Sequence, residues 1–183
     1  MGKPLKNPPV FFTVVQVRFN PLLKLADYLP TIQESFRKSG FPAFTPRLST
    51  VFRITISDGQ SQPHPAQHEQ YLFTNVQQTH SFVLSTDSLT FQSTDYGTFG
   101  NFSGQFLKGL ALVHEALQLD FTDRVGLRYL DHVQPKAGED LLQYVPEIMG
   151  LSAKLGGNTV HSYCETLRFI GSVGQRTRVL VQD

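Results

Sequence analysis

Three strand-like segments separated by only a few residues constrain the fold of this chain more than any other feature. They span residues 70–78, 81–87 and 89–94, and each is rich in β-branched and aromatic residues. Parallel neighbours need a crossover of about a dozen residues, whereas antiparallel neighbours need only a short turn. The sequence therefore predicts antiparallel pairing here and excludes a doubly wound parallel sheet.

Further strands are predicted on both sides of this run. In residues 10–19, Val15 and Val17 alternate with Gln16 and Arg18, which predicts a strand with one face against a core and the other toward water. Similar patterns indicate strands over residues 47–57, 124–133, 160–170 and 175–182. A short glycine-containing turn joins the last two strands, so they are expected to form a hairpin.

The first of two helical segments begins after the strand at residues 10–19. Asn20 and Pro21 resemble an N-cap followed by proline at the first helical position, and apolar residues recur at helical spacing as far as Phe36. Gly40 is the predicted stop. Pro30 lies inside this run, so the helix is expected to be kinked or split there.

The second helical segment is predicted over residues 96–117. Its apolar positions recur at intervals of three and four, which gives one helical face: Phe99, Phe102, Phe106, Leu110, Val113 and Leu117. Gly100, Gly104 and Gly109 each cost the helix roughly 1 kcal/mol relative to alanine. Either these glycines permit close packing against the sheet, or the helix starts later.

Residues 58–68 are predicted to be a loop, because Gly, Pro, Ser and Gln dominate this stretch. His64 and His68 have the spacing of metal ligands on a helix. Pro63 and Pro65 rule out a helix at this point, so no metal site is expected.

The order of elements predicts one α+β domain over residues 10–183, with an antiparallel or mixed sheet and two long helices packed on one face. Residues 1–9 contain three prolines and no periodicity, so they are expected to form a flexible arm. A short helix is predicted over residues 140–148. The last strand reaches residue 182, and an exposed sheet edge there predicts either a homodimer or a further C-terminal segment.

The composition removes several classes of protein. One cysteine, Cys164, permits neither an internal disulfide nor a cysteine-based zinc site. The sequence has no apolar run of about 18 residues and no signal-peptide pattern, so a cytoplasmic location without a membrane partner is expected. Neither a glycine-rich phosphate loop nor a Gly-x-Ser-x-Gly elbow occurs. No cofactor or metal is therefore expected.

The candidate ligand-binding residues lie around the strand at 124–133. Arg124 and Arg128 are four residues apart, so they share a strand face about 13 Å from each other. Tyr129 and Asp131 lie beside them in the sequence, and Tyr96 is expected to line the same region. Two arginines on one face can bind a phosphate-bearing ligand or an acidic partner. Alternatively, the arginines pair with Asp or Glu inside the molecule, and Tyr96 packs in the core.

Basic residues are concentrated near the N-terminus, although the net charge is only +1. Residues 1–57 contain eight of the sixteen Lys and Arg residues but only two of the fifteen acidic ones. A nucleic-acid surface requires basic residues with interleaved aromatics. The candidates for such a surface are Arg18, Arg47 and Arg53 with Phe19, Phe44 and Phe52.

Three motifs together resemble a sporadically distributed, functionally uncharacterised family of bacterial and archaeal proteins. They are PPVFFTVVQVRFNP at residues 8–21, FQSTDYGTFGNF at 91–102 and RVGLRYLDHV at 124–133, and the third is the most specific. The resemblance covers residues 8–134. It implies a chain with further C-terminal strands and helices, and it assigns no activity. Its pattern positions are Arg18, Tyr96, Phe99, Arg124, Gly126, Arg128 and Tyr129.

The leading hypothesis is a non-enzymatic protein-binding module of a prokaryote, in a defence, toxin-neutralising or mobile-element setting, with a protein partner or a second copy bound. One alternative is a protein or enzyme that binds a nucleotide or another anionic small molecule through the strand carrying Arg124 and Arg128. The other is nucleic-acid binding through the basic N-terminal half. The absence of a catalytic constellation favours a binding role and leaves enzymatic activity open.

Overall fold

The computed structural model describes residues 8–57, 60–139, 143–144 and 161–182. Contacts divide the chain into two units, Met1–His132 and Val133–Asp183. The expected arm before residue 8 and most of the expected helix at 140–148 lie outside the described residues. The expectation of a single domain over residues 10–183 stays a prediction.

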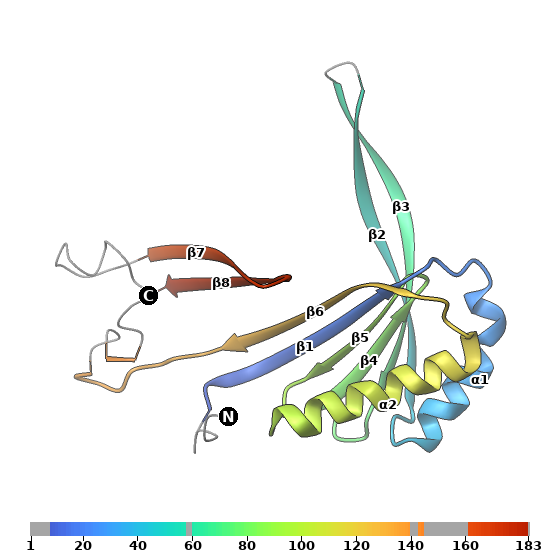
Figure 1. The fold of residues 1–183 in the computed structure, drawn as a ribbon, viewed down its shortest axis with the longest axis horizontal. Helices are drawn as coiled ribbons and strands as arrows, with labels where there is room; N and C mark the ends of the chain where they lie inside the picture. Colours follow the sequence, from blue (N-terminus) through green and yellow to red (C-terminus); the bar gives the residue numbers. More distant parts are fainter. Residues whose placement is uncertain (1–7, 58–59, 140–142, 145–160, 183) are drawn as a thin grey trace. The chain divides into compact units, whose positions relative to one another are not determined.

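The first unit contains a six-stranded sheet (Figure 1). Its strands are β1 (Val10–Phe19), β2 (Ala43–Ser57), β3 (Gln60–Thr74), β4 (His80–Ser85), β5 (Ser88–Ser93) and β6 (Thr122–Asp131). Their order across the sheet is β2-β3-β4-β5-β1-β6, and every pair of neighbours is antiparallel. The predicted antiparallel α+β architecture is thereby confirmed, and strands predominate in it.

Two helices make the long connections of this sheet. Helix α1 (Leu25–Lys38) links β1 to β2, and α2 (Phe99–Leu117) links β5 to β6. The predicted start of α1 at Asn20-Pro21 is wrong. The backbone N–H groups of Phe19 and Leu22 donate to carbonyl groups in the turn between β4 and β5, so this stretch is held against that turn and the helix begins at Leu25.

Pro30 does not split α1, contrary to one of the two expectations. The proline itself is exposed. Leu25 on one side of it and Ile32 and Phe36 on the other are almost completely buried in the same core. Breaking the helix at Pro30 would remove one of these groups from the core, so burial on both sides outweighs the lost backbone hydrogen bond.

Phenylalanine rings from neighbouring strands and both helices form the centre of the core. Phe73, Phe82 and Phe91 are directly opposite one another on β3, β4 and β5. The centroids of Phe82 and Phe91 are 4.5 Å apart. Phe36 of α1 stacks on Phe73 at 4.5 Å, and Phe102 of α2 lies 5.1 Å from Phe91. The apolar periods of two helices and three strands therefore converge on one set of rings.

Gly109 explains why α2 tolerates glycine inside its helical pattern. A Cβ atom at Gly109 would lie 2.2 Å from the ring of Phe82, which is far inside van der Waals contact. A Cβ at Gly100 or Gly104 would meet nothing within 4 Å. The helix includes all three glycines, so close packing, one of the two expected explanations, applies at Gly109 alone.

The predicted loop at residues 58–68 is wrong, because β3 begins at Gln60 and pairs with β2 along its whole length. Only Gln70–Thr74 of β3 also pairs with β4, so the outer part of the hairpin is a two-stranded ribbon (Figure 1). Pro63 and Pro65 are two residues apart, so both lack an N–H on the same edge of the strand. In a two-stranded ribbon each strand has one edge without a neighbouring strand, and proline is tolerated in such edge strands.

The second unit contains the predicted C-terminal hairpin. Strands β7 (His161–Ile170) and β8 (Val173–Gln182) pair antiparallel around a turn in which Gly171 has a φ of +60°. Glu165 forms ion pairs with Arg176 and Arg178 across the hairpin. Cys164 is a free, partly buried thiol.

None of the helices in the described part of the chain is both long enough and apolar enough to cross a membrane.

Candidate sheet-edge site

Strand β6 lies at one end of the six-stranded sheet and pairs with β1 along one side only. Successive residues of an antiparallel strand direct their backbone N–H and C=O groups alternately to its two edges. About half of these groups in β6 therefore point to the side where no strand is paired in the described residues of this unit. Such an edge is a template for one more strand.

One face of β6 carries an exposed apolar row, which consists of Val125, Leu127 and Tyr129. Their exposed fractions are 65%, 45% and 39%. Val125 is directly opposite Val17 of β1, and Leu127 is opposite Val15. Opposite residues share a face, so the apolar row lies on the face of the sheet that carries the buried core of β1. The row itself is largely uncovered.

The other face of β6 carries Arg124 and Arg128, here called the β6 arginines. Both side chains are exposed, and neither forms an ion pair or hydrogen bond with any residue that the structure describes. Gly126 lies between them, and the guanidinium of Arg124 is 4.0 Å from the place where a Cβ of Gly126 would be. Within the described residues, intramolecular neutralisation of these two cations is therefore absent.

A third arginine lies beside the β6 arginines on the neighbouring strand. Arg18 of β1 is directly opposite Arg124. Its guanidinium forms a 2.9 Å ion pair with Asp87, which offsets its charge. Two like charges directly opposite on a sheet are destabilising. Because Arg18 is paired with Asp87, the uncompensated positive charge on this face comes from the β6 arginines.

Tyr129 connects the apolar row to the beginning of α2. Its hydroxyl lies 3.2 Å from that of Tyr96, and the two rings meet edge to face at 5.3 Å. Tyr96 also packs against Phe102 at 5.6 Å. Burial raises the pKa of Tyr129 well above its usual value, and the hydrogen bond with Tyr96 adds to this rise. The Tyr129 phenol therefore stays protonated, and the two tyrosines act together as a hydrogen-bonding and packing pair.

The five predicted site residues thus fall into two groups on opposite faces of β6. Tyr96 and Tyr129 meet on the apolar-row face, and Arg124 and Arg128 share the other face. Asp131, at the end of the strand, is exposed and alternates with the arginines, so it is not aligned with them. Sequence reasoning missed the exposure of Val125 and Leu127, although it found their alternation.

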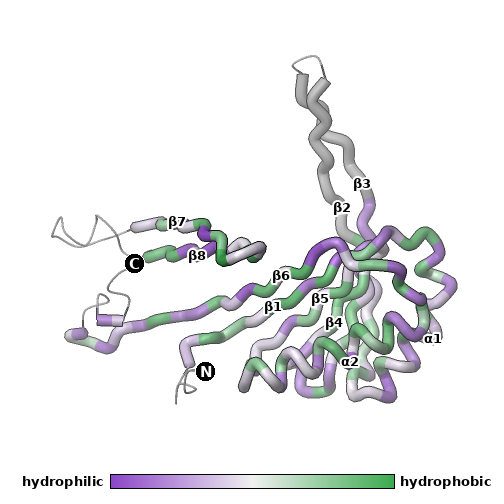
Figure 2. The backbone as a smooth tube through the Cα atoms, viewed as in Figure 1, coloured by the Kyte–Doolittle hydropathy of each residue, from purple (hydrophilic) through white to green (hydrophobic). Residues whose placement is uncertain are grey.

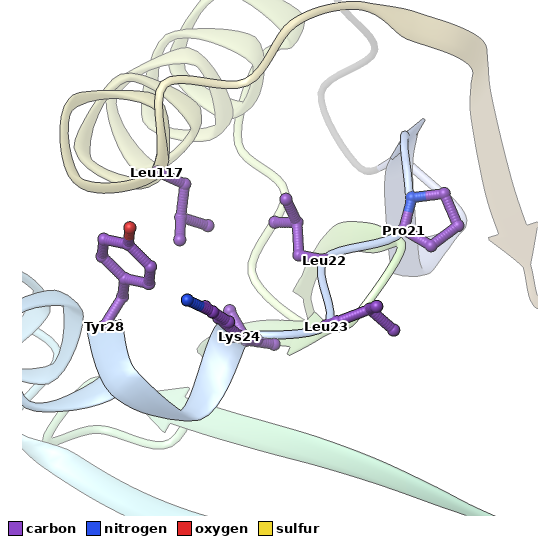
Figure 3. Close-up of a pocket in the computed structure, with 7 residues that line it drawn as sticks. Pro21, Leu22, Leu23, Lys24, Tyr28 and Leu117 are labelled. Atoms are coloured by element: carbon purple, nitrogen blue, oxygen red, sulfur yellow. The ribbon is translucent and has the colours of Figure 1, made fainter.

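The hollows described in this unit lie away from the β6 arginines. One, of about 320 Å³, lies between the start of α1 and the end of α2, where Leu22, Tyr28 and Leu117 meet (Figure 3). Lys24 is the charged group in its lining. A second hollow, of about 370 Å³, lies at the base of the β2–β3 ribbon. Neither is lined by any of the five candidate ligand-binding residues, and Arg47 of the candidate nucleic-acid surface lines the second.

The candidate nucleic-acid residues do not interleave on one surface where the structure describes their side chains. Phe19 is buried in the core, and its neighbour Arg18 is exposed on the other face of β1. The ring centroid of Phe44 lies 5.3 Å from that of the core residue Phe73. Arg47 is three residues further along the same strand and therefore lies on the opposite face. The side chains of Phe52 and Arg53 are outside the described residues.

The described residues contain no group of three or more His, Cys, Asp or Glu side chains arranged to hold a metal ion.

Comparison with known proteins found no match for this chain among protein-family models, curated proteins or solved structures. The resemblance to a family of bacterial and archaeal proteins stays a prediction.

Proposed function

We propose that this protein is a protein-binding module that takes an extended segment of a partner as an added strand along β6. The observation that carries the proposal is a ten-residue edge strand that, among the described residues of its unit, is paired on one side only, combined with three exposed apolar side chains in a row on it. In strand addition, main-chain hydrogen bonds supply affinity and alternate side chains supply specificity. β6 offers both kinds of contact.

The helices contribute by shaping the face beside the edge. Phe36 of α1 lies 4.9 Å from Phe82, and Gly109 of α2 lies directly against the same ring. Two helices that contact one side chain of β4 lie on the same side of that strand, so we infer that α1 and α2 cover one face of the sheet. The apolar row continues this face onto β6, where it is largely uncovered.

The edge of β6 is regular where a partner would pair with it. From Arg124 to Leu127 each residue has a single partner on β1 without a register shift. Protected edges usually carry proline, a bulge, charged side chains or a very short strand, and of these β6 carries charges along its regular stretch. β6 contains no proline, and along it hydrophobic and hydrophilic residues alternate (Figure 2). These properties suit an edge that accepts another strand.

Amide hydrogen exchange on the full chain tests strand addition directly. A seven-residue peptide, Thr-Glu-Val-Thr-Val-Glu-Thr, is added to the protein. Every second amide of β6 should become protected, because only alternate N–H groups face the free edge. Equal protection of all β6 amides, or protection only of amides in other elements, would contradict the proposal.

A pair of substitutions separates this edge from other exposed apolar surface. Leu127→Lys on β6 should abolish peptide binding, because it places a charge in the middle of the apolar row. Leu107→Lys on α2 is the matched control, since Leu107 is at least as exposed as Leu127 and is on a different element. Equal losses from the two variants would indicate general hydrophobic adhesion instead of binding at β6.

A further inference from the structure

We propose that the segment that binds β6 is acidic, with two carboxylate side chains four residues apart and apolar residues between them on the alternate positions. This inference rests on the proposed strand addition and specifies its partner. The β6 arginines and the apolar row occupy opposite faces of one strand. An added strand has the same period of two, so its own residues must divide between these two faces.

Charge complementarity determines one face of the partner. Arg124 and Arg128 are exposed and have no ion pair with the described residues, and Arg18 beside them is neutralised by Asp87. Residues of an added strand opposite the two arginines would themselves be four apart. Glutamate or aspartate at these two positions would place each carboxylate beside one guanidinium, which can form a bidentate pair.

The apolar row determines the other face. The partner's residues between the two acidic positions include two that point to the opposite face, near Val125, Leu127 and Tyr129. β-Branched side chains at these positions would cover apolar surface and also favour the extended conformation. Gly126 presents no side chain opposite the partner residue midway between the acids, and the guanidinium of Arg124 lies 4.0 Å from where its Cβ would be, so a small residue is expected at that position of the partner.

The same parity argument counts against a second copy of β6 as the occupant. When two β6 strands pair antiparallel about a two-fold axis, even-numbered residues meet even-numbered residues. Arg124 and Arg128 are both even, whereas Asp123 and Asp131 are both odd. No such register places an aspartate opposite an arginine, and pairing centred on Gly126 places the arginines opposite each other, which is destabilising.

Two peptides of identical composition test the spacing of the acids. The first is Thr-Glu-Val-Thr-Val-Glu-Thr, in which both glutamates lie on one face of an extended strand. The second is Thr-Glu-Val-Glu-Val-Thr-Thr, in which the glutamates are two residues apart and both valines stay on the opposite face, so that only one glutamate can lie directly opposite an arginine in any register. We expect the first to bind the full chain about two- to fivefold more tightly by calorimetry, which is the value of one exposed ion pair.

Salt and charge exchange sharpen this test. The preference for the first peptide should disappear near 1 M salt, where the Debye length is about 3 Å. The double variant Arg124→Glu with Arg128→Glu should lose the preference and instead favour a peptide with lysines in place of both glutamates. Equal binding of the two glutamate peptides at low salt, or failure of the charge exchange, would overturn the acidic partner.

The outcomes separate this inference from the proposed function. If both glutamate peptides protect alternate amides of β6 but bind equally, strand addition stands and the acidic spacing is wrong. If the first peptide is preferred without protection of alternate amides, the arginines bind acids on the sheet face and the strand-addition model is wrong. If neither binds and the protein is a dimer through β6 in solution, a second copy occupies the edge and both proposals fail.

Discussion

Strands β1 and β6 are neighbours that share an alternation of apolar and polar side chains but have very different surroundings. Each has ten residues, each alternates apolar and polar side chains, and each carries arginine on the polar face. Val15, Val17 and Phe19 of β1 are buried in the core, whereas Val125, Leu127 and Tyr129 of β6 remain exposed. Val17 and Val125 show the contrast most clearly, because they are directly opposite each other on the same face.

This contrast shows that alternation and burial are separate properties. Alternation determines which residues share a face, because side chains of a strand point to its two faces in turn. Burial additionally requires a neighbouring strand on each side and a helix above the face. β1 has both neighbours, and β6 has only one in the described residues. An alternating strand with an uncovered apolar face is therefore a candidate binding surface.

The largest expected difference comes from placing the same charge in each strand. Val17→Asp should destabilise the protein by about 3–5 kcal/mol or prevent folding, because it buries a charge without a partner. Val125→Asp should change the free energy of unfolding by no more than about 0.5 kcal/mol, since its side chain is exposed. Urea denaturation of both variants measures the difference, and similar losses would show that the face of β6 is covered.

A second test concerns how α2 reaches the sheet. Gly109→Ala should destabilise the protein by about 1–3 kcal/mol, because the new methyl group overlaps the ring of Phe82 and the core is overpacked. Gly104→Ala, in open space on the same helix, should stabilise it by about 0.5–1 kcal/mol. Thermal unfolding of the pair decides this, and a gain in stability for Gly109→Ala would contradict the close contact.

The tyrosine pair predicts a dependence on alkaline pH. Burial and the hydrogen bond with Tyr96 raise the pKa of Tyr129 in the folded protein above the usual value near 10. The unfolded chain therefore loses this proton first as the pH rises, and its contribution to stability, complete below about pH 10, declines above it. Tyr129→Phe should make the loss of stability above pH 10 less steep.

Tyr71 needs its own control in that experiment. Burial, and secondarily its hydrogen bond to Glu69, raise the pKa of Tyr71 as well. Tyr71→Phe should therefore also reduce the slope of stability against pH, and the two reductions should add in the double variant. An unchanged slope in Tyr129→Phe would mean that this phenol ionises equally readily in the folded and unfolded chains.

The smallest expected effect on stability belongs to the β6 arginines. Arg124→Gln should leave the free energy of unfolding unchanged or raise it by a few tenths of a kcal/mol, because it removes a like charge directly opposite Arg18. A loss above about 1 kcal/mol, measured by urea denaturation, would show that Arg124 supports the fold. Unchanged stability together with weakened binding of the acidic peptide would place its role in recognition.

Several elements could be predicted because their determinants are local. The strand predicted at residues 10–19 coincides with β1, and the helix predicted over 96–117 contains α2. The shared face of the β6 arginines follows from their spacing alone. Two local predictions failed where distant contacts dominate. Helix α1 begins later than predicted, because the residues before it form hydrogen bonds to the β4–β5 turn. The segment predicted as a loop at 58–68 forms a strand from Gln60, because it pairs with β2 despite Pro63 and Pro65.

The candidate site divides in the same way. Parity placed Arg124 with Arg128, but it also places Tyr129 and Asp131 on the face away from them, so their closeness in sequence was misleading. The contact between Tyr96 and Tyr129 joins residues 33 positions apart and depends on how α2 begins beside β6. The sequence pattern of neither segment predicts that these two residues meet.

The sequence by itself determined which residues can form strands and helices, and which side chains of each element face the same way. These properties depend on backbone geometry, which repeats every two residues in a strand and every 3.6 in a helix. The tertiary structure alone decided that β1 lies inside the sheet and β6 at its edge. Strand order depends on the long connections through α1 and α2, and on burying the largest apolar surface at once.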